Sequence, residues 1–341
     1  MGDQASFKHQ QSHTYKIWLT FVLAILLLFV SFIASLSIGA YRIDFLSVIT
    51  YLFHHDESEP ALIIHSIRMP RAIIGMIIGA CLAMAGAMMQ AITNNPLASP
   101  QIFGINAGAS LMVVITVVLF PDFSPTSIVY FAFVGAALGG CIVYYMASTG
   151  GGMTPVKLAL SGITIHMFLS SIIEGIVIFN ETSTEDVLFW LAGGIDGRNW
   201  TDVQIIMPWF LVGLVLAFGI SRSLTILSLG DDVARGLGQK IALIRIVTAI
   251  LVIILAGASV AIAGPIGFVG LIVPHIARKL VGSDYRLIIP ASGLLGGVLL
   301  NISDVVSRFV SFPSESPVGI VTALIGAPFF LYLARRGGRS L

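Results

Sequence analysis

Long apolar runs alternate with short polar segments along almost the whole chain. A helix needs about 20 apolar residues to cross the hydrocarbon core of a bilayer. Runs of that length predict about ten transmembrane helices, at residues 17–40, 72–93, 102–120, 127–148, 158–179, 203–221, 241–262, 264–281, 287–309 and 317–334. The eighth run carries glycines and prolines throughout, which is tolerated at membrane depth only where protein or a water-lined cavity surrounds it. We therefore expect an all-α, polytopic membrane domain spanning residues 1–341, with a short tail at 1–16.

Composition supports the same conclusion. The chain is 57% hydrophobic and 10% charged, with a mean hydropathy of +0.97, whereas a soluble domain is about 25% charged. A net charge of +1 gives no indication of a nucleic-acid partner. The two cysteines, Cys81 and Cys141, lie inside apolar runs, which is typical of small buried hydrophobic residues. We expect no metal site and no cofactor.

The distribution of basic residues predicts the orientation. Cytoplasmic loops of membrane proteins are enriched in lysine and arginine. If the amino terminus lies inside, 13 of the 18 basic residues fall on the inner side and five on the outer side. We therefore expect a multi-pass protein of the bacterial cell membrane with both termini in the cytoplasm.

Three of the five outer arginines lie at the mouths of predicted spans. Arg68 and Arg71 precede the second span, and Arg308 is near the end of the ninth. Such side chains often extend to phospholipid headgroups, and Arg308 can also pair with Asp304 one turn earlier. Three arginines on one face favour a further role, because carboxylates of another protein would find complementary charge there.

An internal similarity links two distant segments. The sequence GACLAMAGAMMQAITNNPLASPQIFG, from Gly79, aligns without gaps on GASVAIAGPIGFVGLIVPHIARKLVG, from Gly257, with seven identities in 26 positions. The two segments begin in spans two and seven, so the copies would cross the membrane in opposite directions. Inverted repeats with helices broken by glycine and proline are typical of transporters, and small residues also let helices pack closely.

Polar residues inside the predicted spans are few. His166 lies in the middle of the fifth span and Glu174 towards its outer end. Ionisable groups in a span are functional candidates, and a separation of eight positions places these two about 80° apart around a helix. We expect them to line a pathway. No G-x-x-x-x-G-K-[ST] motif occurs, so the chain does not hydrolyse ATP by itself, and we find no catalytic set.

The inner loop between spans six and seven has the pattern of a short capped helix. Asp231 and Asp232 suit its beginning, Arg235 its end, and Gly236 and Gly238 stop it. This segment is either an ordinary capped loop or a short helix that docks a soluble partner.

Taken together, these segments resemble the FecCD-type permease subunits of ABC importers for iron(III)–siderophores, haem and vitamin B12. The resemblance runs from about Ile17 to Arg336. It rests on RMPR, WLAGG, SLGDDVARGLGQ, GPIGFVGLIVPHIARKLVGSDYR, DVVSR and ESPVGIVTALIGAPFFLYLARR, in that order. Ser316 departs from the family pattern, which usually has an aliphatic residue there.

The resemblance implies roles for particular residues. Arg68, Arg71 and Arg308 would receive glutamates from an external binding protein. A coupling loop would contact the ATPase through Gly230, Asp231, Asp232, Ala234, Arg235, Gly236, Leu237 and Gly238. The implied partners are a second permease subunit, two cytoplasmic ATP-binding subunits and an extracellular or periplasmic binding protein.

The expected function is import of iron(III)–siderophores by a non-enzymatic permease. Vitamin B12 or haem is the alternative cargo within the family. From another class, a secondary transporter driven by an ion gradient would also fit an inverted repeat and Glu174.

Overall fold

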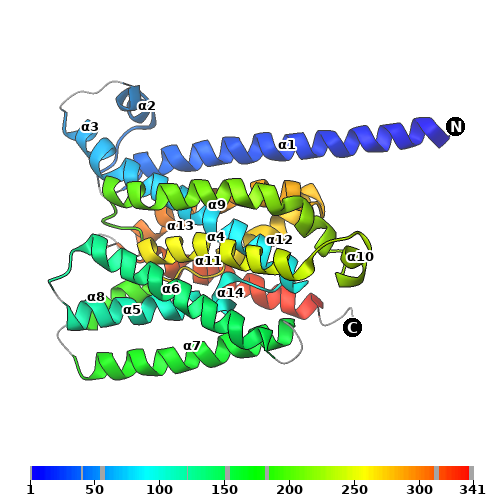
Figure 1. Ribbon diagram of the computed structural model, residues 1–341. Coiled ribbons are helices and arrows are strands. Elements are labelled where there is room, and N and C mark those ends of the chain that lie inside the picture. The colour runs from blue at the N-terminus through cyan, green and yellow to red at the C-terminus, as the bar shows by residue number, and fades with distance from the viewer. Residues whose placement is uncertain are drawn as a thin grey trace.

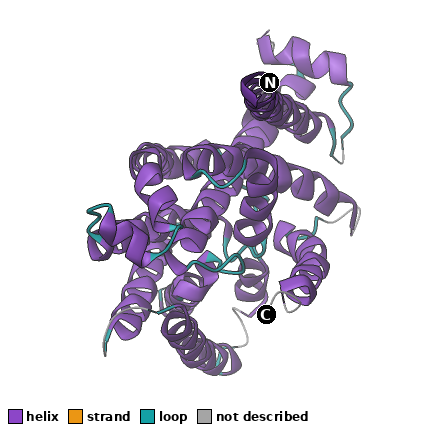
Figure 2. Ribbon diagram, turned by 90° about the vertical axis from the view of Figure 1, so that its right-hand side faces the viewer, coloured by secondary structure: helices purple, strands orange, loops and turns teal. Residues whose placement is uncertain are grey.

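Helices make up all the regular structure of the chain in the computed structural model, within the residues that it describes: 2–39, 41–53, 58–120, 122–149, 154–180, 184–310 and 315–337. The long helices lie roughly along one direction, as Figure 1 shows from the side and Figure 2 from the end where α1 begins. The elements are α1 (Gly2–Ser37), α2 (Phe45–Phe53), α3 (Glu59–Ile63), the π-helix η1 (Ile64–Arg68), α4 (Met69–Thr93), the 3-10 helix η2 (Pro100–Phe103), α5 (Ile105–Leu119), α6 (Pro125–Ser148), α7 (Pro155–Ile178), α8 (Thr184–Ala192), α9 (Trp200–Leu227), α10 (Asp231–Gly236), α11 (Ile241–Ala263), α12 (Val269–Val281), α13 (Tyr285–Val310) and α14 (Val318–Gly337).

Each of the ten predicted spans falls on a helix, although not every helix is long enough to cross a bilayer alone. Seven helical segments within the described residues have the length and composition of a membrane span. The other three predicted spans correspond to α5, α12 and α14, and α12 has only 13 residues because residues 264–268 before it are not helical. Helix α1 reaches back to Gly2, so residues expected to form a tail continue the first helix.

Helix α4 forms the centre of the bundle and is buried on nearly all sides. Its glycines allow neighbouring backbones to come very close. A Cβ atom on Gly79 would lie 2.2 Å from the carbonyl oxygen of Gly296 in α13, and one on Gly86 would lie 1.9 Å from that of Gly270 in α12. Because lipid tails are as apolar as the side chains, such close packing replaces the hydrophobic effect as the force between helices.

The predicted opposite directions of spans two and seven are present in α4 and α11. The segment leading into α4 contacts the beginning of α9, where the Trp200 Nε1 donates to the His65 carbonyl oxygen at 2.9 Å, whereas α11 begins at the other end, next to α10. The gapless alignment does not hold along its whole length, however. Helix α11 ends at Ala263, which aligns with Ala85, while α4 continues eight residues further, to Thr93.

The two ends of the molecule differ in what they carry. Both termini and α10 lie at one end, which we call the terminus end, and α2, α3 and α8 lie at the other (Figure 1). Arg68, Arg71 and Arg308 all belong to the end opposite the termini, since the chain reaches η1 directly from α3, and Arg308 is near the end of α13.

Candidate functional site

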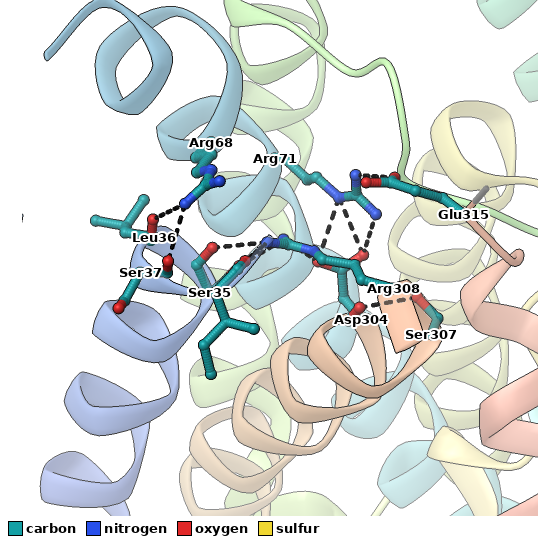
Figure 3. Close-up of polar contacts among 10 residues, drawn as sticks. Ser35, Leu36, Ser37, Arg68, Arg71, Asp304, Ser307, Arg308 and Glu315 are labelled. Carbon is teal, nitrogen blue, oxygen red and sulfur yellow. Dashed lines mark hydrogen bonds and ion pairs between the residues drawn. The ribbon is translucent and has the colours of Figure 1, made fainter. Parts of the chain in front are cut away.

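Arg71, Asp304 and Glu315 form an ion-pair chain at the end opposite the termini (Figure 3). The Nη2 atom of Arg71 lies 2.7 Å from Oδ1 of Asp304, and its Nε also donates to that carboxylate, so the contact is bidentate. Its Nη1 pairs with Glu315, whose side chain is 38% exposed, whereas that of Asp304 is 1% exposed. Arg71 therefore connects a buried carboxylate on α13 to a surface carboxylate just before α14.

Arg68 and Arg308 donate hydrogen bonds to the carbonyl groups at the carboxyl end of α1. The Nη1 of Arg68 donates to the carbonyl oxygens of Leu36 and Ser37 at 2.6 and 3.0 Å. The Nη1 of Arg308 donates to the carbonyl oxygens of Ser35 and Ile38. The last carbonyls of a helix have no partner within it and carry partial negative charge, so these two cations complete the end of α1.

Arg308 also pairs with Asp304, at 2.5 Å and one helical turn away, as the sequence allowed. The three arginines, each about 6–7% exposed, thus all have partners inside the chain, and Arg71 and Arg308 share one of them, Asp304. The described chain leaves little of their donor capacity free, and the docking role remains a prediction. Three arginines against two carboxylates still give this cluster one positive charge in excess. The sequence did not reveal Glu315 or the carbonyls of α1 as partners, because each lies far along the chain from the arginine that it contacts.

His166 and Glu174 line one shared groove, as their spacing predicted. The groove has a volume of about 760 Å³ and lies between η2, the beginning of α5, α7 and α8. Its other polar lining residues are Ser99, Gln101, Asn106, Ser110 and Ser170. Both His166 and Glu174 are exposed in the isolated chain, so the groove is open along α7 and has a mixed polar and apolar wall.

The inner loop contains the predicted short helix, α10, which runs from Asp231 to Gly236. The Asp231 carboxylate lies 3.0 Å from Arg245 at the beginning of α11, and the Ala234 side chain is fully buried, so the loop is held against the bundle. Gly230 and Gly238 have φ angles of 111° and 77°, which favour glycine. On the outer side of this loop, the Val233 and Leu237 side chains are exposed.

A second feature at the terminus end joins α9 to α13. The Thr225 hydroxyl donates to the Asp284 carboxylate at 2.9 Å and accepts from the backbone N–H of Tyr285 at 2.9 Å. Arg286 also donates to Asp284, and chiefly for that reason the pKa of Asp284 lies below its ordinary value. The ends of the two helices are therefore fixed against each other.

Known proteins resemble the chain over most of its length. A model of the FecCD transport family matches residues 26–336. An Fe(3+)-citrate import system permease protein of Bacillus subtilis is 56% identical, covering 93% of this chain and 94% of that protein. An iron(3+)-hydroxamate import system permease protein of the same organism is 45% identical, covering 97% of this chain and 86% of that protein. A solved structure of a metal-chelate type ABC transporter, in an inward-facing conformation, has a TM-score of 0.82 at 28% identity, covering 93% of this chain and 99% of that one.

Proposed function

Because the chain belongs to the FecCD transport family, it is the membrane permease of a bacterial ABC importer, and we propose that its cargo is an iron(III) chelate of the citrate or siderophore type. The names of its relatives support this cargo, since one acts on iron(III) citrate and another on iron(III) hydroxamates. Membership of this family also removes the secondary transporter as an alternative. Haem and vitamin B12 are then the competing cargoes.

The test of the cargo is uptake in a strain that lacks this chain. We expect a loss of at least tenfold in the uptake of radiolabelled iron(III) citrate or iron(III) hydroxamate, restored by the gene in trans, and no change for labelled cobalamin or haem. Lost cobalamin or haem uptake with normal uptake of both iron chelates would show that the proposed cargo is wrong.

We propose that the groove at α7 is one half of the translocation pathway. A groove of about 760 Å³ that is open along one helix can be closed by the same face of a second permease subunit. His166 and Glu174 would then line the pathway together with the small polar side chains beside them. Two cytoplasmic ATP-binding subunits would contact the exposed face of α10, and the terminus end would then face the cytoplasm.

The arginine cluster is the proposed contact for the external binding protein. Because Glu315 already pairs with Arg71, we propose that this contact forms by exchange of one carboxylate for another. A carboxylate brought by the binding protein would meet Arg71 where Glu315 already pairs with it. Glu315 is the more exposed of the two acids on Arg71, so it is the one that an incoming carboxylate can replace. Docking therefore exchanges one carboxylate for another, and it frees the segment that leads into α14.

Replacing Glu315 by glutamine is expected to tighten docking of the transporter's own binding protein. The exchange no longer has to break the partly exposed Arg71–Glu315 pair. If that pair is worth about 0.2–1 kcal/mol, as exposed pairs are, Kd should fall by about 1.4-fold to fivefold. Surface plasmon resonance with the permease complex in nanodiscs measures this change. The matched control is Glu59→Gln, which removes one exposed negative charge at the same end without touching Arg71. Unchanged or weaker docking of the Glu315 variant would contradict the exchange.

A further inference from the structure

A second groove lies on the opposite side of the bundle from α7. It has a volume of about 450 Å³ and lies between α1, α4, α9 and α13. Its wall is made only of apolar residues, among them Phe21, Met84, Phe218, Pro290 and Gly293. Helix α1 touches the bundle loosely here, since only 17% of its membrane-spanning window is buried. At membrane depth, such a groove is open to lipid.

Two arginines stand at the terminus end of this groove. Arg222 follows Phe218 by four residues on α9, and Arg286 precedes Pro290 by four residues on α13, so each lies one helical turn beyond a lining residue on the same face. The Thr225 contacts described above hold these two helix ends together. The two cations therefore flank a single opening.

The two arginines differ in how well they are neutralised. Arg286 pairs with Asp284 at 2.7 Å. Arg222 is exposed, and among the described residues it has no hydrogen-bond or ion-pair partner. The opening thus has one positive charge in excess, directly next to an apolar groove. Basic residues between transmembrane helices near the membrane surface attract acidic lipid headgroups.

We propose that this groove is a binding site for an anionic phospholipid, with an acyl chain between α1 and α9 and the phosphate against Arg222 and Arg286. The apolar wall selects a hydrocarbon chain, and the excess charge selects an acidic headgroup over a zwitterionic one. This lipid would fill the gap beside α1 and stabilise its packing on α13. The groove shares no lining residue with the one at α7, so a second permease on that side leaves it open to the bilayer.

Native mass spectrometry of the full-length chain in detergent, titrated with phosphatidylglycerol or with phosphatidylcholine of the same acyl chains, tests the site. We expect phosphatidylglycerol to bind the unaltered chain at least fivefold more tightly. Arg222→Gln should lower its affinity to that of phosphatidylcholine. Arg42→Gln is the matched control, since it removes an exposed arginine at the opposite end and should leave binding unchanged.

A second variant tests the acyl-chain part of the site. The nearest atoms to a Cβ at Gly293 would belong to Met84 and Ala80, at 3.5 Å or more, so Gly293→Leu is expected to fold and to fill the groove. It should weaken binding of both lipids by at least fivefold. Equal binding of the two lipids by the unaltered chain would overturn the proposal, as would normal lipid binding by both variants. If glycerol phosphate competes fully with the lipid, the acyl chain does not contribute to binding and that part of the proposal is wrong. If the chain forms a dimer that either variant dissociates, this face binds a second copy of the chain instead of a lipid.

Discussion

Replacing Asp304 by asparagine is expected to destabilise the chain by about 3–5 kcal/mol, because two buried arginines then lose their shared counter-charge. Asp304 is 1% exposed and lies within 2.7 Å of both Arg71 and Arg308. Asparagine keeps the shape of the side chain, removes its charge and replaces one of the two acceptor oxygens by an amide donor. The measurement is thermal or denaturant unfolding of the purified chain in detergent, together with the amount of folded protein recovered from the membrane.

Asp232→Asn is the matched control for this substitution. Asp232 also pairs with an arginine, Arg235 at 2.9 Å, but its side chain is 98% exposed. An exposed pair contributes about 0.2–1 kcal/mol, so the control should shift the unfolding midpoint only slightly. Equal shifts for the two variants would contradict the view that burial of the cluster determines its importance. A large destabilisation by Asp304→Asn would also affect the test of docking. It would mean that reversing the charge of Arg71 damages the fold, so that any loss of partner binding could not be assigned to the contact itself.

Replacing Gly236 by tryptophan is expected to lower transport by at least tenfold while leaving the chain folded. No atom lies within 4 Å of the position that a Cβ would occupy at Gly236, so a bulky side chain there extends into solvent. If an ATP-binding subunit contacts this face of α10, the indole ring prevents close approach. Co-purification of the ATP-binding subunits and chelate-stimulated ATP hydrolysis by the reconstituted complex measure the effect.

The control for added bulk is Gly219→Trp in α9, where a Cβ would also meet no atom within 4 Å. This position lies on a different element, so transport and assembly should be close to normal. Normal assembly and normal transport of the Gly236 variant would remove α10 from the proposed interface. Loss of folded protein would instead contradict the open surroundings of Gly236.

The sequence predicted the helices well because the membrane imposes a simple rule on them. Runs of about 20 apolar residues have few alternatives to a helix in lipid, since every backbone polar group must be satisfied within the segment. The exceptions are informative. Helices α2 and α8 were not expected, because nine residues are too few to give a span signal. Residues 264–268 were assigned to a span, although Gly264 has a φ angle of 68° and ends α11.

The candidate sites were predictable to different degrees. Local spacing was sufficient to place His166 and Glu174 in one groove and Asp231 at the beginning of a short helix. The arginines needed information that spacing does not carry. Arg71 meets Asp304 across 233 positions, and Arg308 meets Ser35 across 273, so only the folded bundle brings these partners together.

If the groove at α7 is half of the translocation pathway, as proposed, its open side has a consequence for selectivity. Whichever chain completes the wall also supplies half of its chemical character. Two identical subunits would face each other with a duplicated imidazole and a duplicated acid, whereas a dissimilar subunit would replace one of each. The net charge along the passage would then depend on both subunits. The range of chelates that can pass would depend on the same combination of subunits.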